Sequence, residues 1–155
     1  MTLSSTTLEQ QLTRVRDLES RLTFRLSVLS KLLDQQAVAL LDDAPINLTG
    51  YRILNVINTF GEISISDISR FCAIDRAQVS RAAAELSRQE LVAFRSDPVS
   101  KRKKIVVLTA EGGALLNELS PRFLARNTTL NEVLGAERRE ALLDAINRLS
   151  AHVSP

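Results

Sequence analysis

The first forty residues carry leucine and valine at alternating steps of four and three positions. The stripe consists of Leu8, Leu12, Val15, Leu22, Leu26, Leu29, Leu33 and Leu40, and only Glu19 and Gln36 interrupt it. This spacing predicts one helix over residues 8–41 with a heptad-like apolar face. Such a helix would be roughly 50 Å long at 1.5 Å per residue, which exceeds what a small domain covers by itself. We therefore expect a second chain to cover the stripe; packing against the C-terminal segment of the same chain is the alternative.

Three shorter amphipathic helices are predicted after the Pro-, Asn- and Gly-containing segment 42–51. The first covers residues 49–60, with Thr49 as its N-cap and Gly61 after its end. The second covers residues 64–73 and follows almost at once. The third begins after Asp75, a favourable N-cap, and its inward side is set by apolar residues at steps of four and three, namely Val79, Ala83 and Leu86.

The outward side of the third helix carries no acid along its centre line. Turning 100° per residue from the inward stripe places Ala77, Arg81, Ala84 and Arg88 there, with Gln78 and Ser80 beside them. Two β-type runs follow, at residues 91–96 and 103–108, and an Asp-Pro turn signal lies between them. The chain therefore predicts a β-hairpin with a cationic tip directly behind this helix.

Two further helices are predicted in the last third of the chain. Thr109 is the expected N-cap of the first, which Pro121 should bend, and the boundary between the two is expected near residues 127–131. Apolar stripes mark both helices: Leu115, Leu116, Leu119 and Phe123 in the first, and Leu142, Leu143, Ile146 and Leu149 in the second. The predicted fold class is mainly α with one small β-hairpin.

Composition removes most catalytic interpretations. The 155 residues include one His, one Cys and five Gly, so the chain offers no metal cluster, no Cys-His pair and no phosphate-binding glycine loop. We expect no enzyme activity, no metal and no cofactor. The single Cys72 excludes an internal disulfide framework, and without an 18-residue uncharged apolar run or a leader at the N-terminus we expect a cytoplasmic protein with no membrane partner.

Charge is distributed unevenly although the totals nearly balance. The chain contains twenty Lys and Arg and eighteen Asp and Glu. Four cations in succession, residues 101–104, nevertheless form the predicted hairpin tip. Two short helices joined by a tight turn, the second with an acid-free outer face, fit the major groove of double-stranded DNA, which is about 12 Å wide. A cationic hairpin beside them can reach the flanking phosphates. The segment therefore predicts a helix-turn-helix with a wing.

The predicted DNA-binding residues come from three places. Arg81 can bond a guanine edge through two N–H groups, and Gln78 can do the same for adenine. The full set consists of Ser64 and Ser66 at the start of the first helix of the helix-turn-helix, then Arg76, Ala77, Gln78, Ser80 and Arg81, and finally Lys101, Arg102, Lys103 and Lys104. The alternatives are a solvated polar face, or an adaptor whose basic tip meets an acidic protein.

These residues resemble the multiple antibiotic resistance regulator (MarR) family of bacterial winged-helix transcription factors, over nearly the whole chain. The segment "IDRAQVSRAAAELSRQELVAFRSDPVSKRKKIVVLTAEG" is similar to the family's recognition helix, strand entry, Asp-Pro wing and Leu-Thr-x-x-Gly helix start. "LTGYRIL" is similar to the opening of the family's second helix. On these matches residues 75–81 take the recognition-helix positions and residues 97–104 take the wing.

The resemblance implies a domain organisation. The whole chain, 1–155, would be one MarR-like domain, with a DNA-binding lobe at 46–108 and dimerisation helices at 8–43 and 109–153. It also implies a homodimer on a palindromic operator, most often a repressor, released by a small aromatic or phenolic acid. Phe24, Arg25, Tyr51 and Arg52 could hold such an effector, although core packing of the aromatics is the alternative.

Three departures from the family pattern bear on the structure. The wing has Ser100, Lys101 and Arg102 where members commonly have Asp-Arg-Arg, so we expect a looser wing. Ala73 replaces a frequent turn glycine, and residues 89–91 lack the glycine usual before the first wing strand. Some family members sense oxidants through a cysteine near the start of the first helix, whereas Cys72 falls on an apolar stripe and is expected to act as a buried hydrophobe.

Overall fold

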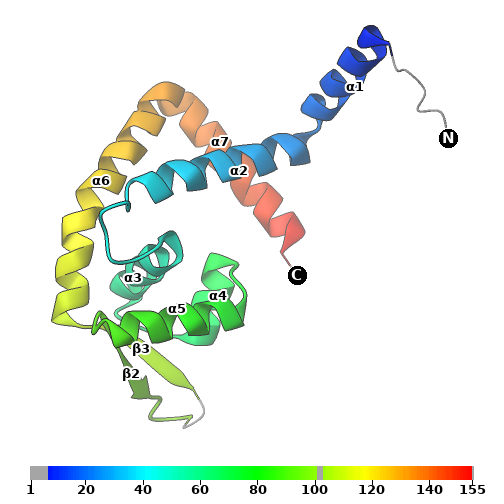
Figure 1. The fold of residues 1–155 in the computed structure, drawn as a ribbon. Coiled ribbons are helices and arrows are strands. Elements are labelled where there is room, and N and C mark those ends of the chain that lie inside the picture. Colours follow the sequence, from blue (N-terminus) through cyan, green and yellow to red (C-terminus); the bar gives the residue numbers. More distant parts are fainter. Residues whose placement is uncertain (1–6, 101–102, 155) are drawn as a thin grey trace. The chain divides into compact units, whose positions relative to one another are not determined.

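The computed structural model describes residues 7–100 and 103–154, and helices predominate in it (Figure 1). The chain divides into two units of dense internal contact, residues 1–43 and residues 44–155. The first unit consists of two helices. The second holds the helix-turn-helix, a small sheet and the last two helices, and each unit is described by itself.

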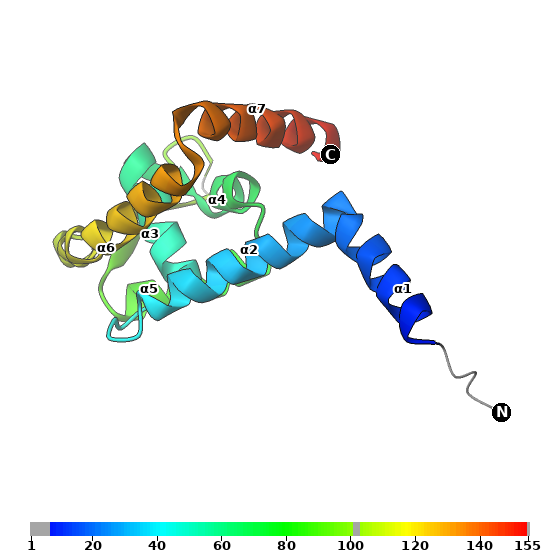
Figure 2. The same ribbon diagram turned by 90° about the horizontal axis from the view of Figure 1, so that it is seen from above.

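The predicted single helix over residues 8–41 is wrong, because the structure has two helices, α1 (Leu8–Ser20) and α2 (Leu22–Ala39). Arg21 separates them with extended backbone, φ −73° and ψ 120°, so the two helices run in different directions (Figure 2). Its guanidinium turns back to Asp17, with Nη2 2.8 Å from Oδ2. Neither glycine nor proline marks this break, and the apolar stripe continues across it.

The second unit begins with a three-helix layer formed by α3 (Leu48–Phe60), α4 (Ile65–Cys72) and α5 (Arg76–Arg88). The N-cap of α3 is Asn47, whose Oδ1 accepts from the Gly50 N–H at 2.9 Å, so the expectation of Thr49 as the cap is wrong. Each of the three helices contributes fully buried side chains to the core. These side chains include Ile53, Leu54, Ile57, Ile68, Val79 and Leu86.

A three-stranded antiparallel sheet replaces the predicted two-stranded hairpin. The predicted strands are present as β2 (Val92–Ser96) and β3 (Lys104–Leu108), and β3 also pairs on its other edge with β1 (Glu62–Ser64). In this register Ile63 and Phe94 both lie opposite Val106. Because β1 runs directly into α4, the sheet joins the wing to the helix-turn-helix.

The last two helices are α6 (Ala110–Leu134) and α7 (Ala136–Val153). The helix boundary expected at residues 127–131 is wrong, since α6 continues through it and through Pro121. Thr128 and Thr129 fit the helix by donating their hydroxyls to the carbonyls of Leu124 and Ala125. The chain turns instead at Gly135, whose φ of +72° suits glycine. Thr109 is the N-cap of α6, as predicted.

Candidate nucleic-acid interface

Helix α5 presents two chemically different faces. Its inner face is apolar and fully covered, with Val79 and Ala83 at 0% and Leu86 at 1% exposure. On the opposite face the residues predicted to contact DNA are all exposed: Arg76, Ala77, Gln78, Ser80 and Arg81. The outer face of α5 is thus available to a groove, as the sequence predicted.

The N-terminus of α5 is fixed by the Asp75 side chain. Its Oδ1 accepts from the backbone N–H groups of Ala77 at 3.0 Å and Gln78 at 3.1 Å, which satisfies two of the helix's unpaired donors. The predicted N-cap is confirmed. These two hydrogen bonds hold the first turn of α5, and therefore Arg76 and Gln78, in a defined position.

The turn between α4 and α5 uses a strained alanine. Ala73 has φ 51° and ψ 39°, in the left-handed region where glycine is the favoured residue. Two hydrogen bonds close the turn around it, from Ile74 N to the Ser69 carbonyl at 3.1 Å and from the Ser69 hydroxyl to the Ile74 carbonyl at 2.7 Å. Alanine therefore adopts the turn conformation for which the family pattern commonly has glycine, and it does so at a conformational cost.

The wing is ordered by Asp97 at its turn. The Asp97 carboxylate accepts from the N–H groups of Val99 at 2.7 Å and Ser100 at 3.1 Å. These two hydrogen bonds, together with the nearby Lys103 charge, lower the pKa of Asp97 from its ordinary value. Across the sheet Arg95 Nη1 lies 3.4 Å from Glu62 Oε1, which links β2 to β1.

Two cations of the wing, Lys103 and Lys104, lie at the start of β3. Lys103 and Lys104 are exposed, and Lys104 Nζ lies 5.6 Å from the centroid of the Phe94 ring. Lys101 and Arg102 lie outside the described residues. The position of the described lysines agrees with a wing that reaches phosphates.

The start of α4, the first turns of α5 and the base of the wing meet around one hollow of about 260 Å³. The described residues that line it include no acid and are Ser64, Ile65, Ser66, Arg76, Ser80, Lys103 and Lys104. Hydroxyls and cations converging on one place provide the donors that a phosphate group requires. The structure thus brings together predicted residues from all three sequence segments.

Ser64 plays a more structural part than the sequence suggested. It is 4% exposed, and its hydroxyl accepts from the Asp67 N–H at 3.2 Å while donating to Asp67 Oδ2 at 2.5 Å. The hydroxyl therefore caps α4, and Ser66 is the more accessible of the two serines.

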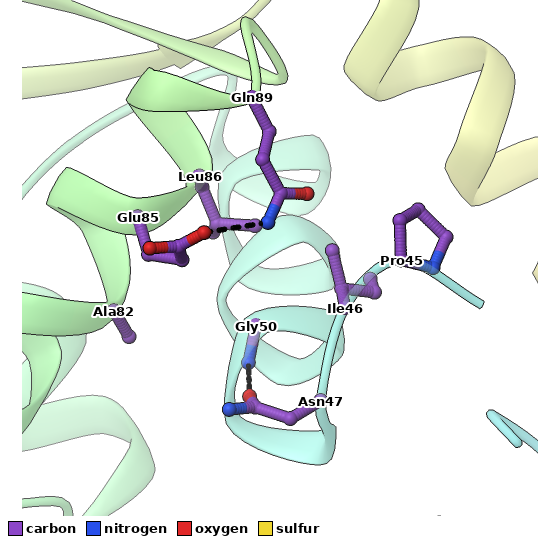
Figure 3. A pocket seen from close by; sticks show the side chains of 8 residues that line it. All are labelled: Pro45, Ile46, Asn47, Gly50, Ala82, Glu85, Leu86 and Gln89. Atoms are coloured by element: carbon purple, nitrogen blue, oxygen red, sulfur yellow. Dashed lines mark hydrogen bonds between the residues drawn. The ribbon is translucent and has the colours of Figure 1, made fainter.

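On the side away from the exposed face, α5 packs against the beginning of α3 (Figure 3). The two segments are closely packed, since a Cβ at Gly50 would make ordinary van der Waals contacts with Leu86 Cδ2 at 3.4 Å and Ile46 Cβ at 3.5 Å. At the rim Gln89 Nε2 donates to Glu85 Oε1 at 2.8 Å. A hollow of about 320 Å³ remains between the two segments.

The four predicted effector residues divide between the two units. Phe24 and Arg25 line a hollow of about 540 Å³ on the first unit, together with leucines of α2. In the second unit Tyr51 is buried and stacks on Phe123, with ring centroids 3.7 Å apart at 15°. Arg52 is exposed on α3. The stack with Phe123 was not predicted, since no local pattern links residues that far apart; the effector site itself stays a prediction.

Cys72 is half-buried, and burial raises the pKa of its thiol. The Arg52 charge opposes this shift more weakly. The arginine lies twenty positions earlier, so its approach could not be seen in the local sequence. Within residues 7–100 and 103–154 no group of His, Cys, Asp and Glu is arranged to hold a metal ion, and no helix is long and apolar enough to span a membrane.

The winged-helix segment matches a known family. The model described as "MarR family" fits residues 45–103, which cover α3, the sheet's first two strands and the helix-turn-helix between them. A curated relative, the HTH-type transcriptional repressor NicR of Pseudomonas putida, is 29% identical over 96 residues.

The similarity to the MarR family therefore lies in the winged-helix segment of the chain. The match to NicR covers 62% of the chain and 61% of NicR, so it spans less than two thirds of that relative's length. A solved structure of Bordetella bronchiseptica BpsR, described for the regulation of its DNA binding by 6-hydroxynicotinic acid, superposes with a TM-score of 0.68 at 25% identity, over 81% of the chain and 98% of BpsR.

A DNA complex is also among the MarR structures that share this fold. The S. aureus MepR–DNA complex superposes with a TM-score of 0.79 at 20% identity, over 88% of the chain and 99% of MepR. At this identity the likeness establishes the fold alone. Together with the family match it confirms the predicted fold class, a mainly helical winged helix-turn-helix.

Proposed function

We propose that the chain is a transcriptional regulator that binds double-stranded DNA in a sequence-specific manner as a homodimer, acts as a repressor on a palindromic operator, and is released by a small aromatic acid. The observation that carries the DNA-binding part is the hollow lined by Ser66, Arg76, Ser80, Lys103 and Lys104 beside the exposed face of α5. One duplex can meet both features at once, with base edges against α5 and backbone phosphates in the hollow.

Individual residues have distinct roles in this proposal. Arg81 reads a base edge from the middle of the exposed face, and Gln78 reads a neighbouring position one turn earlier. Arg76, Ser80 and the wing lysines hold phosphates, which contributes affinity without sequence preference. Ala77 has a small side chain, so the helix backbone can approach the bases closely.

The homodimer is supported by the apolar surface that the chain leaves uncovered. No residue of α1 or α7 is buried. Large apolar side chains stay exposed along both helices, including Leu8, Leu12 and Val15 in α1 and Leu142, Leu143 and Ile146 in α7. Surfaces of this kind mark protein interfaces, and a second copy would also supply the second lobe that a palindrome requires.

DNA recognition is tested by selecting bound sequences from a random duplex pool and measuring variants on the selected site. Arg81→Ala should weaken binding by about 1–3 kcal/mol and relax the preference at one base position, because a bidentate contact is lost. Lys103→Gln should weaken binding to all sequences alike and reduce the salt slope by about one. Arg138→Ala, which removes an exposed arginine from α7, is the matched control and should change neither quantity.

Two results would contradict DNA recognition. One is an Arg81→Ala protein with unchanged affinity and unchanged base preference. The other is binding that does not fall by orders of magnitude between about 50 and 200 mM salt, because a dimer with several phosphate contacts must release counterions. Salt-independent binding would favour a protein-interaction adaptor.

The effector proposal rests on the relationship to BpsR, whose DNA binding 6-hydroxynicotinic acid regulates. We expect 6-hydroxynicotinate to release the selected operator from this chain, and Arg25→Ala or Arg52→Ala to abolish release while DNA affinity is retained, because a guanidinium pairs with the carboxylate. Fluorescence anisotropy of labelled operator measures both. The uncharged 6-hydroxynicotinamide is the matched control, and equal release by it would contradict carboxylate recognition.

A further inference from the structure

Two phenylalanines lie in contact on the surface of the second unit, outside the DNA-binding face. Phe60 ends α3 and is 51% exposed, and Phe71 lies near the end of α4 and is 64% exposed. Their ring centroids are 5.2 Å apart at an interplanar angle of 83°, an edge-to-face pair. The chain has only five phenylalanines. Placing two of them together in solvent leaves an apolar surface uncovered, and neither the core nor the proposed DNA contact accounts for it.

The phenylalanine pair borders a hollow of about 400 Å³ between the end of α3, the sheet and α4. Its floor is apolar, with Ile63 from β1 and Ile105 from β3. Its charged lining consists of two carboxylates, Glu62 and Asp67, and no lysine or arginine is among the described residues that line it. Aromatic rings and carboxylates in one hollow form an environment suited to a cation with an apolar body.

The geometry of the pair leaves room for a cation on a ring. In an edge-to-face pair the ring that offers its edge has neither face covered by the other ring. Because both side chains are more than half exposed, a ring face is open to solvent. An ammonium group can lie over this face and meet a carboxylate beside it.

Two arginines are the competing cations. Arg95 Nη1 lies 3.4 Å from Glu62 Oε1, and Arg70 pairs with Asp67. All four of these side chains are at least 44% exposed, and ion pairs at such exposure contribute little. A ligand ammonium can therefore share these carboxylates, while the arginines move into solvent.

We propose that this hollow, the Phe60–Phe71 site, binds a small organic ammonium ion with an alkyl or aryl body. A volume of about 400 Å³ suits a small molecule, and a free amine is therefore the occupant rather than a lysine of a protein partner. None of the four proposed effector residues lines this hollow, and the site prefers the opposite charge. Its affinity should be on the order of millimolar, because exposed cation–π contacts and ion pairs are individually weak.

The test is a titration of the full-length protein with n-butylammonium chloride at constant ionic strength, followed through the δ1-methyl NMR signals of its isoleucines. The signals of Ile63 and Ile105 should shift and saturate. Neutral n-butanol and anionic n-butyrate should bind at least about tenfold more weakly, which separates ammonium recognition from apolar filling.

Variants locate the binding. Phe71→Ser should weaken butylammonium binding by about tenfold, and Glu62→Gln should weaken it by a smaller factor. Phe94→Ser is the matched control: it removes a part-exposed phenylalanine of the same lobe that does not line the hollow, and it should leave the amine affinity unchanged. Circular dichroism checks that each variant is folded. Without amine, Phe71→Ser should bind DNA as the parent does, so the outcome is independent of DNA recognition.

Three results would overturn the proposal. The first is no saturable shift of Ile63 and Ile105 with butylammonium. The second is equal affinity for butylammonium and n-butanol. The third is tighter binding of a capped Ala-Lys-Ala peptide than of the free amine, because it would identify a protein lysine as the occupant.

Discussion

At the scale of single residues, one glycine determines how closely the start of α6 can approach the entry of β2. Gly112, in the first turn of α6, lies against the strand entry of β2. A Cβ at this position would be 1.9 Å from the Leu91 carbonyl oxygen and 2.9 Å from its carbon, and both atoms belong to the backbone. Leu91 also accepts from the Thr109 N–H at 3.2 Å. The start of α6 and the entry of β2 are thus held at a separation that only glycine allows.

Gly112→Ala should lower the free energy of unfolding by about 3 kcal/mol or more, because the backbone at Leu91 must move to admit the methyl group. Gly113→Ala is the matched control. It has no atom within 4 Å of its would-be Cβ, and it should raise stability by about 0.5–1 kcal/mol through helix propensity. Urea denaturation measures both, and equal effects of the two substitutions would contradict the close contact.

At the scale of the elements, the N-terminal ends of helices were easier to predict from sequence than the C-terminal ends. Asp75 and Thr109 are both N-caps in the structure, as predicted from their residue type and position. The C-terminal ends differ: α3 ends at Gly61 with φ +75°, whereas α4 ends at Ala73 with φ 51°. Both residues have a positive φ, but only Ala73, with ψ 39°, lies in the left-handed helical region, whereas Gly61 has ψ −55°.

Ala73→Gly should raise the free energy of unfolding by about 0.5–1 kcal/mol, because glycine adopts the left-handed conformation without the Cβ clash. Gly61→Ala should act in the opposite direction by a similar amount, although its would-be Cβ meets no atom within 4 Å. Thermal unfolding of the two variants tests the sign. A destabilised Ala73→Gly protein would show that the turn is not under conformational strain.

The elements that sequence reasoning missed depend on contacts distant in the chain or on weak local signals. Strand β1 has three residues and exists through its pairing with β3, more than forty positions later. The helix break at Arg21 contains neither glycine nor proline, and the leucine spacing continues across it, so no sequence pattern predicted it. Residues 127–131 were misjudged because threonine and asparagine disfavour helix, yet the hydroxyls of Thr128 and Thr129 bond within α6.

The candidate interface was easier to predict than the fold around it, because amphipathic periodicity and charge are local properties. The exposure of Gln78 and Arg81 followed from counting along one helix. The burial of Ser64 did not, since it depends on the sheet that places the start of α4. The Phe60–Phe71 contact likewise joins two helices whose relation only the fold defines.

At the scale of the whole molecule, the apolar stripe of the first unit carries large side chains that are exposed. Leu22 is 59% and Leu29 is 48% exposed on α2. Leu22→Glu combined with Leu29→Glu should convert the proposed dimer to monomers or to insoluble protein, because two charges would have to be buried in an apolar interface. Sedimentation velocity measures the outcome.

Lys31→Glu, which changes charge at an exposed polar position of α2, is the matched control and should remain dimeric. An intact dimer in the double leucine variant would contradict the assignment of this stripe to the interface. The DNA affinity of a soluble monomer should also fall, since two linked half-sites bind more tightly than one.

Strand β3 is hydrogen-bonded along both of its edges, to β2 on one side and to β1 on the other, and β1 passes without a linker into α4. The wing strands and helix α5, which carry the proposed phosphate and base contacts, therefore belong to one connected body. The binding of an effector can therefore do little to move these elements relative to one another. In the proposed dimer, release from DNA would therefore come from a change in the separation of the two DNA-binding lobes, so that their spacing no longer matches the helical repeat of the duplex.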